Sequence, residues 1–118
     1  MMKVLIVDDN AEMRRLLRSL VTRQVEAVYE CEDGAQAVDA YATEHLTAAD
    51  WVLMDIEMPR VDGLEATRQL KSIWPDARVC IVTGYDRPEL REAAKTAGAS
   101  DFIAKENLHI VRRLLQLV

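Results

Sequence analysis

Short apolar runs and helical patterns alternate five times along this chain, and this alternation restricts its fold more than any other feature. The apolar runs are rich in Val, Ile and Leu and lie at residues 3–7, 25–31, 51–54, 78–82 and 101–104. A helical pattern follows each run, at residues 11–23, 35–44, 64–73, 87–97 and 107–118. Strands that alternate with helices form parallel sheets whose right-handed crossovers place helices on both faces. We therefore expect an α/β fold with a doubly wound, five-stranded parallel sheet.

Local signals support several of these boundaries. Asp86 has a proline two residues later and Glu89 three residues later, which predicts an acidic N-cap for the helix at 87–97. Gly98 follows the end of the same pattern, where a glycine typically ends a helix.

Length and composition fit one domain over residues 1–118. A chain of 118 residues with 50% hydrophobic content lies in the usual size range of single domains, and it has no linker or internal repeat. Its net charge of -5 has the wrong sign for holding a phosphate backbone, so we expect no DNA binding by this chain itself. No apolar stretch approaches the ~20 residues that span a bilayer, and no signal peptide is evident. We expect a cytoplasmic protein without membrane contact.

The cysteines and histidines do not form a metal-binding pattern. Cys31 and Cys80 lie in or beside apolar runs, where a free thiol behaves as a small hydrophobic side chain. His45 and His109 are isolated in helical segments, and no spacing resembles a zinc site. We expect buried free thiols and surface histidines.

Polar residues stand where four of the five apolar runs end. Asp8 and Asp9 follow the first run, Asp55 the third, Thr83 the fourth and Lys105 the fifth. The carboxyl ends of parallel strands share one edge of the sheet, and ligands bind in the crevice outside that edge. These side chains are therefore expected to converge.

Three carboxylates at one edge would repel one another unless a cation joined them. Oxygen ligands favour a hard cation, and Mg²⁺ commonly takes one or two carboxylates while it retains water that a phosphate can replace. One Mg²⁺ together with Lys105 would neutralise Asp8, Asp9 and Asp55. The sequence thus predicts a magnesium site that is suited to a phosphoryl group.

Four motifs in order resemble the receiver domain of two-component response regulators. They are KVLIVDDN at the start, VLMDIEMPRVDG around Asp55, VTG at Thr83 and AGASDFIAKENL around Lys105. Each motif alone is weak, but together they cover the whole chain at strand ends and at the spacing of that family. The resemblance implies a flavodoxin-like (βα)5 fold with strand order 2-1-3-4-5.

The resemblance also implies a role for each acidic site residue. Asp55 would be the phosphoacceptor, taking its phosphoryl group from a sensor histidine kinase, a phosphotransfer protein or a small acyl phosphate. Asp9, Asp55 and the backbone carbonyl of Glu57 would ligate Mg²⁺, while Asp8 would hold the metal through water. A carboxylate that is ionised at pH 7 needs no general base to act as a nucleophile. We therefore expect a regulatory phosphoacceptor and not an enzyme, with chemistry limited to its own phosphorylation and dephosphorylation.

The remaining site residues would bind the phosphoryl group and transmit its presence to the protein surface. Lys105 would pair with phosphoryl oxygens, and Thr83 would offer its hydroxyl to one of them. Phe102, three residues before Lys105, matches the aromatic switch position of the family. Thr83 would move toward the phosphoryl group, and Phe102 would rotate into the space it leaves. Glu57 and Tyr85, each two residues past a site residue, are positions thought to tune the phosphoryl lifetime in this family.

Each of these residues also has an ordinary structural interpretation. Asp9 precedes Glu12 by three residues, as a helix-capping aspartate would. Lys105 could be a solvated lysine, Thr83 a strand terminus and Phe102 a core aromatic. Four coincidences at one sheet edge favour the functional interpretation.

The segment around Lys105 also suggests a subfamily. Glu106 stands where many receivers have a proline, and KENL resembles the receivers of NarL-type transcription regulators. In those receivers the first and fifth helices can form a phosphorylation-dependent homodimer. The apolar residues of 107–118 cover about half of a helix circumference, more than one sheet face needs. The expected core stripe is Leu108, Val111, Leu115 and Val118, and the expected exposed edge is Ile110, Leu114 and Leu117. The same edge could instead cover the end of the core or meet an output domain.

Three alternative functions compete with the proposed one. A phosphatase of the haloacid dehalogenase type also uses a strand-end aspartate, with a general acid at the place of Glu57. That acid is normally aspartate, such enzymes are longer, and Asp8–Asp9 has no place in them. A pseudo-receiver would not need the intact set of site residues. The receiver would control transcription through a C-terminal DNA-binding output domain, and the alternative is a stand-alone regulator.

Overall fold

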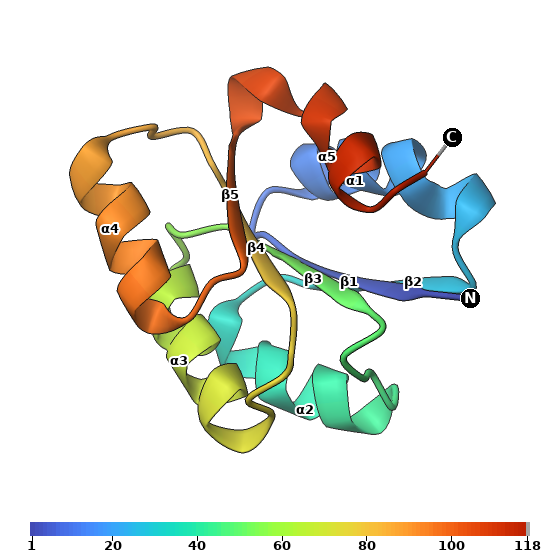
Figure 1. Ribbon diagram of the computed structural model, residues 1–118, viewed down its shortest axis with the longest axis horizontal. Coiled ribbons are helices and arrows are strands. Elements are labelled where there is room, and N and C mark those ends of the chain that lie inside the picture. Colours follow the sequence, from blue (N-terminus) through green and yellow to red (C-terminus); the bar gives the residue numbers. More distant parts are fainter. Residues whose placement is uncertain (118) are drawn as a thin grey trace.

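The structure is a computed structural model that describes residues 1–117, and it contains all five expected strand and helix pairs (Figure 1). The strands are β1 (Lys3–Val7), β2 (Ala27–Cys31), β3 (Trp51–Met54), β4 (Val79–Thr83) and β5 (Asp101–Ala104). The α-helices are α1 (Ala11–Val21), α2 (Ala37–Thr43), α3 (Gly63–Ile73), α4 (Pro88–Ala97) and α5 (His109–Leu114). Three 3-10 turns lie at Thr22–Gln24, Gly34–Gln36 and Lys105–Asn107.

All strands are parallel, and their order is β2-β1-β3-β4-β5. This confirms the predicted doubly wound sheet and its order 2-1-3-4-5. Helices α1 and α5 cover one face, and α2, α3 and α4 cover the other (Figure 1). Successive strands are added toward one edge of the sheet from β1 to β2 and toward the other edge from β3 to β5. The carboxyl ends of β1 and β3 therefore flank the crevice in which such folds bind ligands.

Each face of the sheet has its own hydrophobic core. Along β1, Val4 and Ile6 point toward α1 and α5, while Leu5 and Val7 pack against the α2 and α3 side. All four side chains are fully buried. A strand buried on both faces explains why β1 appears in the sequence as a continuous apolar run and not as an alternating one.

The ends of several elements differ from the predicted ones. The helix predicted at 11–23 ends as an α-helix at Val21 and continues as a 3-10 turn, and the strand predicted from residue 25 begins at Ala27. The helix predicted at 107–118 starts at His109 and ends at Leu114. Gln116 has a positive φ of 60°, which stops helical hydrogen bonding even though the apolar pattern goes on. Val118 lies outside the described residues.

Helix caps also differ from the prediction at two places. Asn10 caps α1 by accepting a hydrogen bond from the Met13 amide, so the alternative that Asp9 is the capping side chain is wrong. Arg87 occupies the N-cap of α4 without a side-chain cap, and Asp86 instead pairs with Arg91. The glycine at the end of α4 is confirmed, because Gly98 has a φ of 101°.

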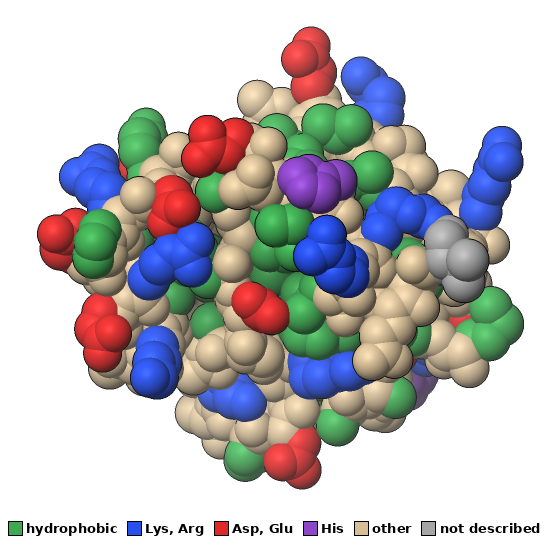
Figure 2. Space-filling view, turned by 45° about the horizontal axis from the view of Figure 1, so that its top comes forward, with side chains coloured by type: hydrophobic (Ala, Val, Ile, Leu, Met, Phe, Trp, Pro, Cys, Tyr) green, Lys and Arg blue, Asp and Glu red, His purple; other side chains and the backbone are tan. Residues whose placement is uncertain are grey.

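Helices α1 and α5 lie side by side, and Figure 2 shows hydrophobic side chains at the centre of the side that carries α5. Val111 and Leu115 are buried, as predicted for the core stripe, while Leu108 is half-buried. The expected exposed edge is less open than predicted, because Ile110, Leu114 and Leu117 are half-buried and pack against the core. Leu16 of α1 is a large apolar side chain that is 46% exposed.

The cysteines and histidines lie as the sequence predicts. Cys31 and Cys80 are buried free thiols, and His45 and His109 are exposed, as predicted. Among residues 1–117, no helix has the length and apolar character that crossing a bilayer requires.

Candidate functional site

The carboxyl ends of four strands bring the predicted site residues to one edge of the sheet. Asp8 and Asp9 follow β1, and Asp55 follows the neighbouring strand β3. Carboxylate oxygens of these three residues lie within 4.8 Å of one another. Thr83 ends β4 and Lys105 follows β5. The predicted convergence of these residues is confirmed.

An open pocket of about 690 Å³ lies over this edge. Asp9, Asp55, Thr83 and Lys105 line it, and the exposed residues Glu57 and Tyr85 stand at its sides. Its walls are mixed, because Met58 and Pro59 add apolar surface beside the acidic groups.

Lys105 links two of the buried carboxylates. Its Nζ lies 3.1 Å from Asp8 Oδ2 and 3.3 Å from Asp55 Oδ1. Asp8 and Asp55 are buried, with exposed fractions of 2% and 6%, whereas Asp9 is exposed. Within residues 1–117, Asp8 Oδ2 has this ion pair but no hydrogen bond of good geometry. One lysine thus holds two buried charges and leaves one buried oxygen incompletely satisfied.

Burial and the neighbouring acid make Asp55 hard to ionise. The pKa of Asp55 is raised to about 6, mainly by burial and secondly by the charge of Asp8, although Lys105 acts in the opposite direction. Burial alone would lower the pKa of Lys105, but the charges of Asp55 and Asp8 outweigh it and raise that pKa. Lys105 is therefore a permanent cation here, and Asp55 is mostly ionised at pH 7.

The acidic cluster fits a hard divalent cation. Its donors are carboxylate oxygens from Asp8, Asp9 and Asp55, which is the ligand chemistry that Mg²⁺ prefers. The incompletely satisfied Asp8 Oδ2 and the raised pKa of Asp55 both indicate a site with more negative charge than Lys105 balances. A cation beside these groups would relieve both conditions.

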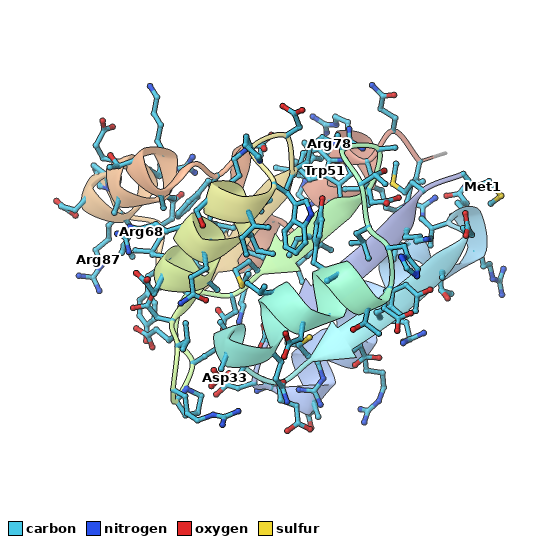
Figure 3. All side chains as sticks on the ribbon, turned by 90° about the horizontal axis from the view of Figure 1, so that it is seen from below. Met1, Asp33, Trp51, Arg68, Arg78 and Arg87 are labelled. Carbon is cyan, nitrogen blue, oxygen red and sulfur yellow. The ribbon has the colours of Figure 1, made fainter. Side chains whose placement is uncertain are left out.

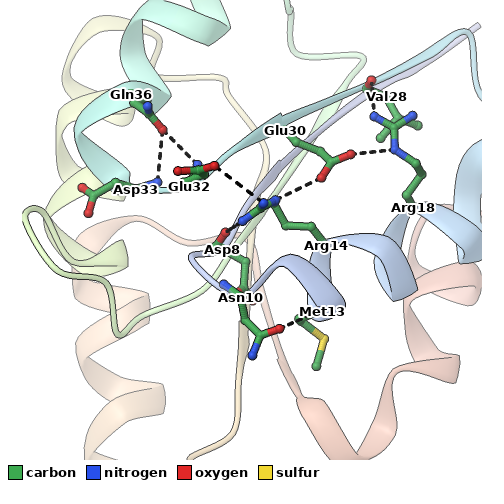
Figure 4. A network of polar contacts seen from close by, with 10 residues as sticks. All are labelled: Asp8, Asn10, Met13, Arg14, Arg18, Val28, Glu30, Glu32, Asp33 and Gln36. Atoms are coloured by element: carbon green, nitrogen blue, oxygen red, sulfur yellow. Dashed lines mark hydrogen bonds and ion pairs between the residues drawn. The ribbon is translucent and has the colours of Figure 1, made fainter.

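Arg14 supports the site from behind, and sequence reasoning missed it. Its Nη1 donates to the Asp8 carbonyl oxygen at 2.7 Å, and its Nε donates to Glu30 Oε1 at 3.0 Å (Figure 4). Arg18 binds the other oxygen of Glu30 and the Val28 carbonyl. The backbone of Asp8 is thus tied to β2. The spacing of Arg14 and Arg18 places them on one face of α1, but nothing in the sequence shows their backbone acceptors.

Gly63 lets the backbone around Asp55 pack against the start of α3. A Cβ at Gly63 would lie 1.8 Å from the Asp55 carbonyl oxygen, and the Gly63 amide donates to the Ile56 carbonyl at 2.8 Å. Asp62 caps the helix by accepting from the Glu65 amide. The VDG motif therefore carries a steric requirement as well as a helix cap.

Thr83 is the last residue of β4, whereas Phe102 is the second residue of the neighbouring strand β5 and pairs with Ile81. Thr83 is buried, and its hydroxyl accepts a hydrogen bond from the Tyr85 amide at 3.2 Å. Phe102 is half-buried, and the Arg91 guanidinium carbon lies 4.6 Å from its ring centroid. Arg91 is in turn held by both carboxylate oxygens of Asp86. The aromatic ring is thus covered by a tethered cation.

Comparison with known proteins shows similarity over most of the chain. The model of the response regulator receiver domain matches residues 4–116. The chemotaxis protein CheY of Bacillus subtilis (strain 168) is 40% identical over 104 residues, which cover 87% of this chain and 84% of that protein. The response regulator MprA of Mycobacterium avium (strain 104) is 36% identical over 104 residues, covering 88% of this chain but 44% of MprA. This chain therefore spans less than half the length of MprA.

A solved structure with bound metal is also similar. The CheX–CheY–BeF3–Mg²⁺ complex of Borrelia burgdorferi contains a chain that is 25% identical, with a TM-score of 0.79. The alignment covers 96% of this chain and 88% of that chain.

Proposed function

This chain belongs to the family of response regulator receiver domains, and we propose that Asp55 is its phosphoacceptor. The observation that carries the proposal is the position of the Asp55 carboxylate in an open pocket, 3.3 Å from Lys105 and beside Asp8 and Asp9. An oxygen of Asp55 forms a bond to phosphorus while the bond from phosphorus to the donor breaks. The product is an acyl phosphate, and the group released is the imidazole of a kinase histidine or the carboxylate of a small acyl phosphate.

The surrounding residues supply the charge that this transfer needs. The incoming phosphoryl group brings its negatively charged oxygens next to the carboxylates, and Lys105 is positioned to pair with them. Thr83 would donate a hydrogen bond from its hydroxyl to one phosphoryl oxygen, because its present contact with the Tyr85 amide uses only the hydroxyl oxygen, as an acceptor. Asp55 needs no general base, because its pKa of about 6 leaves most of it ionised at pH 7.

Asp9, Asp55 and the backbone carbonyl of Glu57 would hold Mg²⁺ directly, and Asp8 would hold it through water. The metal supplies positive charge that offsets the carboxylates and the incoming phosphoryl group. The all-oxygen donor cluster supports this assignment. The related CheY in the complex from Borrelia burgdorferi was solved with BeF3 and Mg²⁺, which supports the same chemistry here.

We regard the chain as a regulatory phosphoacceptor and not as a turnover enzyme. The rival phosphatase function would need a general acid two residues after Asp55, and Glu57 there is exposed. Turnover of phosphate monoesters separates the two functions. Release of many phosphates per chain would favour the phosphatase, whereas a receiver holds at most one phosphoryl group at Asp55.

The direct test of phosphorylation uses acetyl phosphate and Mg²⁺. The intact mass of the wild-type chain should rise by about 80 Da, the mass of one phosphoryl group. Asp55→Asn should abolish the increase, and Asp62→Asn, which removes an exposed carboxylate from the same loop, should leave it intact. An unchanged increase in Asp55→Asn would overturn the assignment.

The signal would leave the site through Thr83 and Phe102. Movement of Thr83 toward the phosphoryl group would free space on the β5 side, and Phe102 would rotate toward it. The half-buried position of Phe102 on β5, next to β4, supports this path. The surface formed by α4, β5 and α5 would change as a result.

We propose that this protein is cytoplasmic and that its phosphoryl donor is a sensor histidine kinase or a phosphotransfer protein. The output of the receiver would be control of transcription through a DNA-binding domain beyond this segment. The support for this proposal is that the response regulator MprA is more than twice as long as its matched part. The alternative is a stand-alone regulator, for which the match to 84% of CheY is the support. Reading the gene downstream for a helix-turn-helix pattern decides between them.

A phosphorylation-dependent homodimer through α1 and α5 is the second proposed partner interaction. The two helices are adjacent, Leu16 of α1 is 46% exposed, and Leu114 and Leu117 of the α5 segment are half-buried. Sedimentation with and without beryllofluoride should show association that strengthens with the phosphoryl analogue and is lost in Leu16→Glu. A protein that stays monomeric in both states at tens of micromolar would contradict the dimer.

A further inference from the structure

Asp33 ties the loop after β3 to the start of α2, although it lies far from Asp55 in the sequence. Its Oδ2 accepts a hydrogen bond from the Arg60 amide at 2.9 Å, and its Oδ1 accepts from the Val61 amide at 3.0 Å. The same Oδ1 accepts from the Ala35 amide at 2.9 Å. The side chain is buried, with an exposed fraction of 5%. One carboxylate therefore joins two loops through three backbone amides.

The backbone next to Asp33 makes this junction close. A Cβ at Gly34 would lie 2.4 Å from the Val61 carbonyl oxygen, so the two loops meet backbone to backbone. The Gln36 side chain returns to the amides of Glu32 and Asp33 and holds the turn in place (Figure 4). Figure 3 shows Asp33 where α2 begins, beside the loop that leads into α3.

The loop that Asp33 holds is the loop that carries Glu57. Its beginning is fixed by the Asp55 amide, which donates to the Val7 carbonyl, and its end by the Gly63 amide, which donates to Ile56. Arg60 and Val61 lie in its middle and are fixed by Asp33. Glu57, whose carbonyl is the proposed metal ligand, stands between these anchors.

We propose that Asp33 is a positioning residue for the metal site, because it holds the 57–61 loop in the conformation in which the Glu57 carbonyl can bind Mg²⁺. This inference rests on the proposed function. Without the two hydrogen bonds from the Arg60 and Val61 amides, the loop would have to be ordered by the metal itself, and the cost of that ordering would weaken Mg²⁺ binding. Burial would raise the pKa of Asp33, but its backbone donors and Arg60 outweigh burial and keep that pKa below its ordinary value. Asp33 is thus a permanent acceptor at neutral pH.

The test compares two aspartates that both cap a helical turn. Asp33→Asn exchanges one acceptor oxygen for an NH2 group that faces backbone donors. Asp62→Asn changes the cap of α3 at the end of the same loop, where the carboxylate accepts only from the neighbouring Glu65 amide. Calorimetric titration with Mg²⁺ should show about tenfold weaker binding for Asp33→Asn, the usual effect of losing a group that orients metal ligands. Asp62→Asn should bind within twofold of wild type.

Each outcome decides the inference. A loss of thermal stability in both variants with unchanged Mg²⁺ affinity would show that Asp33 is only structural and would overturn the proposal. Absence of Mg²⁺ binding by the wild-type chain would overturn the proposed metal site itself, and this inference with it.

Hydrogen exchange of the wild-type chain tests the same point if Asp33→Asn does not fold. The amides of Arg60 and Val61 should be protected in the metal-free protein and should change little when Mg²⁺ is added. Amides that become protected only on metal addition would show that the metal, and not Asp33, orders the loop.

Discussion

Replacing Asp55 by asparagine should stabilise the metal-free protein, and it should do so only above pH 4. The pKa of Asp55 is raised from 3.8 to about 6 by burial and by the charge of Asp8. The folded protein therefore holds this proton more tightly than the unfolded chain. The stabilisation from the protonated group is fully present below the unfolded pKa and is lost as the pH rises through the folded pKa.

The size of this loss follows from the shift. About two pKa units at 1.36 kcal/mol each give about 3 kcal/mol of lost stability between pH 4 and pH 7 in the wild-type chain. Asparagine has no proton to lose, but Lys105 then keeps only Asp8 as a partner, so part of the gain is cancelled. We expect a net gain of about 1 to 2 kcal/mol at pH 8, or roughly 3 to 8 °C in Tm.

Thermal melts in a chelator from pH 4 to pH 8 measure this difference. Asp55→Asn and wild type should melt together at pH 4 and diverge as the pH rises. Asp9→Asn removes an exposed member of the cluster, so its metal-free stability should equal or slightly exceed that of wild type, while its Mg²⁺ binding weakens. A difference that does not depend on pH, or a less stable Asp55→Asn at pH 8, would refute the electrostatic reasoning.

Two further predictions concern packing and the switch. Gly63→Ala should lower the free energy of unfolding by about 3 kcal/mol or more in urea melts, because the new Cβ would collide with the Asp55 carbonyl. Gly84→Ala, whose Cβ would meet nothing within 4 Å, should change it by less than about 1 kcal/mol. Arg91→Ala should free the Phe102 ring and tighten beryllofluoride binding in the presence of Mg²⁺ by about threefold, the value of one exposed cation–π contact. Unchanged or weaker binding would mean that Arg91 does not restrain the ring.

The sequence predicted the number, type and order of the elements because each one carries a local signal. The continuous apolar run of β1 indicates burial on both faces, and the charged residues that follow it mark the strand end. Convergence of Asp8, Asp55 and Lys105 then follows from parallel strands alone. The strand order came from the resemblance to receivers, because the periodicity of a strand does not say which strand lies beside it.

Other features could not be predicted because their causes lie between distant segments. Arg14 and Asp33 act on backbone carbonyls and amides, which have no signature in the sequence. Helix α5 ends at Leu114, earlier than the apolar pattern predicts, because Leu115 and Leu117 still pack on the core after the α-helix has ended. An apolar pattern reports burial, and it does not report where helical hydrogen bonds stop.

The central claim is that one carboxylate, Asp55, takes the phosphoryl group. Borohydride reduces an acyl phosphate to an alcohol, so it converts a phosphorylated aspartate to homoserine and leaves free aspartate unchanged. After treatment with acetyl phosphate and Mg²⁺, reduction and peptide sequencing should place homoserine at residue 55 and at no other position. Homoserine at residue 8 or 9 would contradict the claim. So would a phosphoryl group that resists borohydride, which is the behaviour expected of a phosphate ester on Thr83.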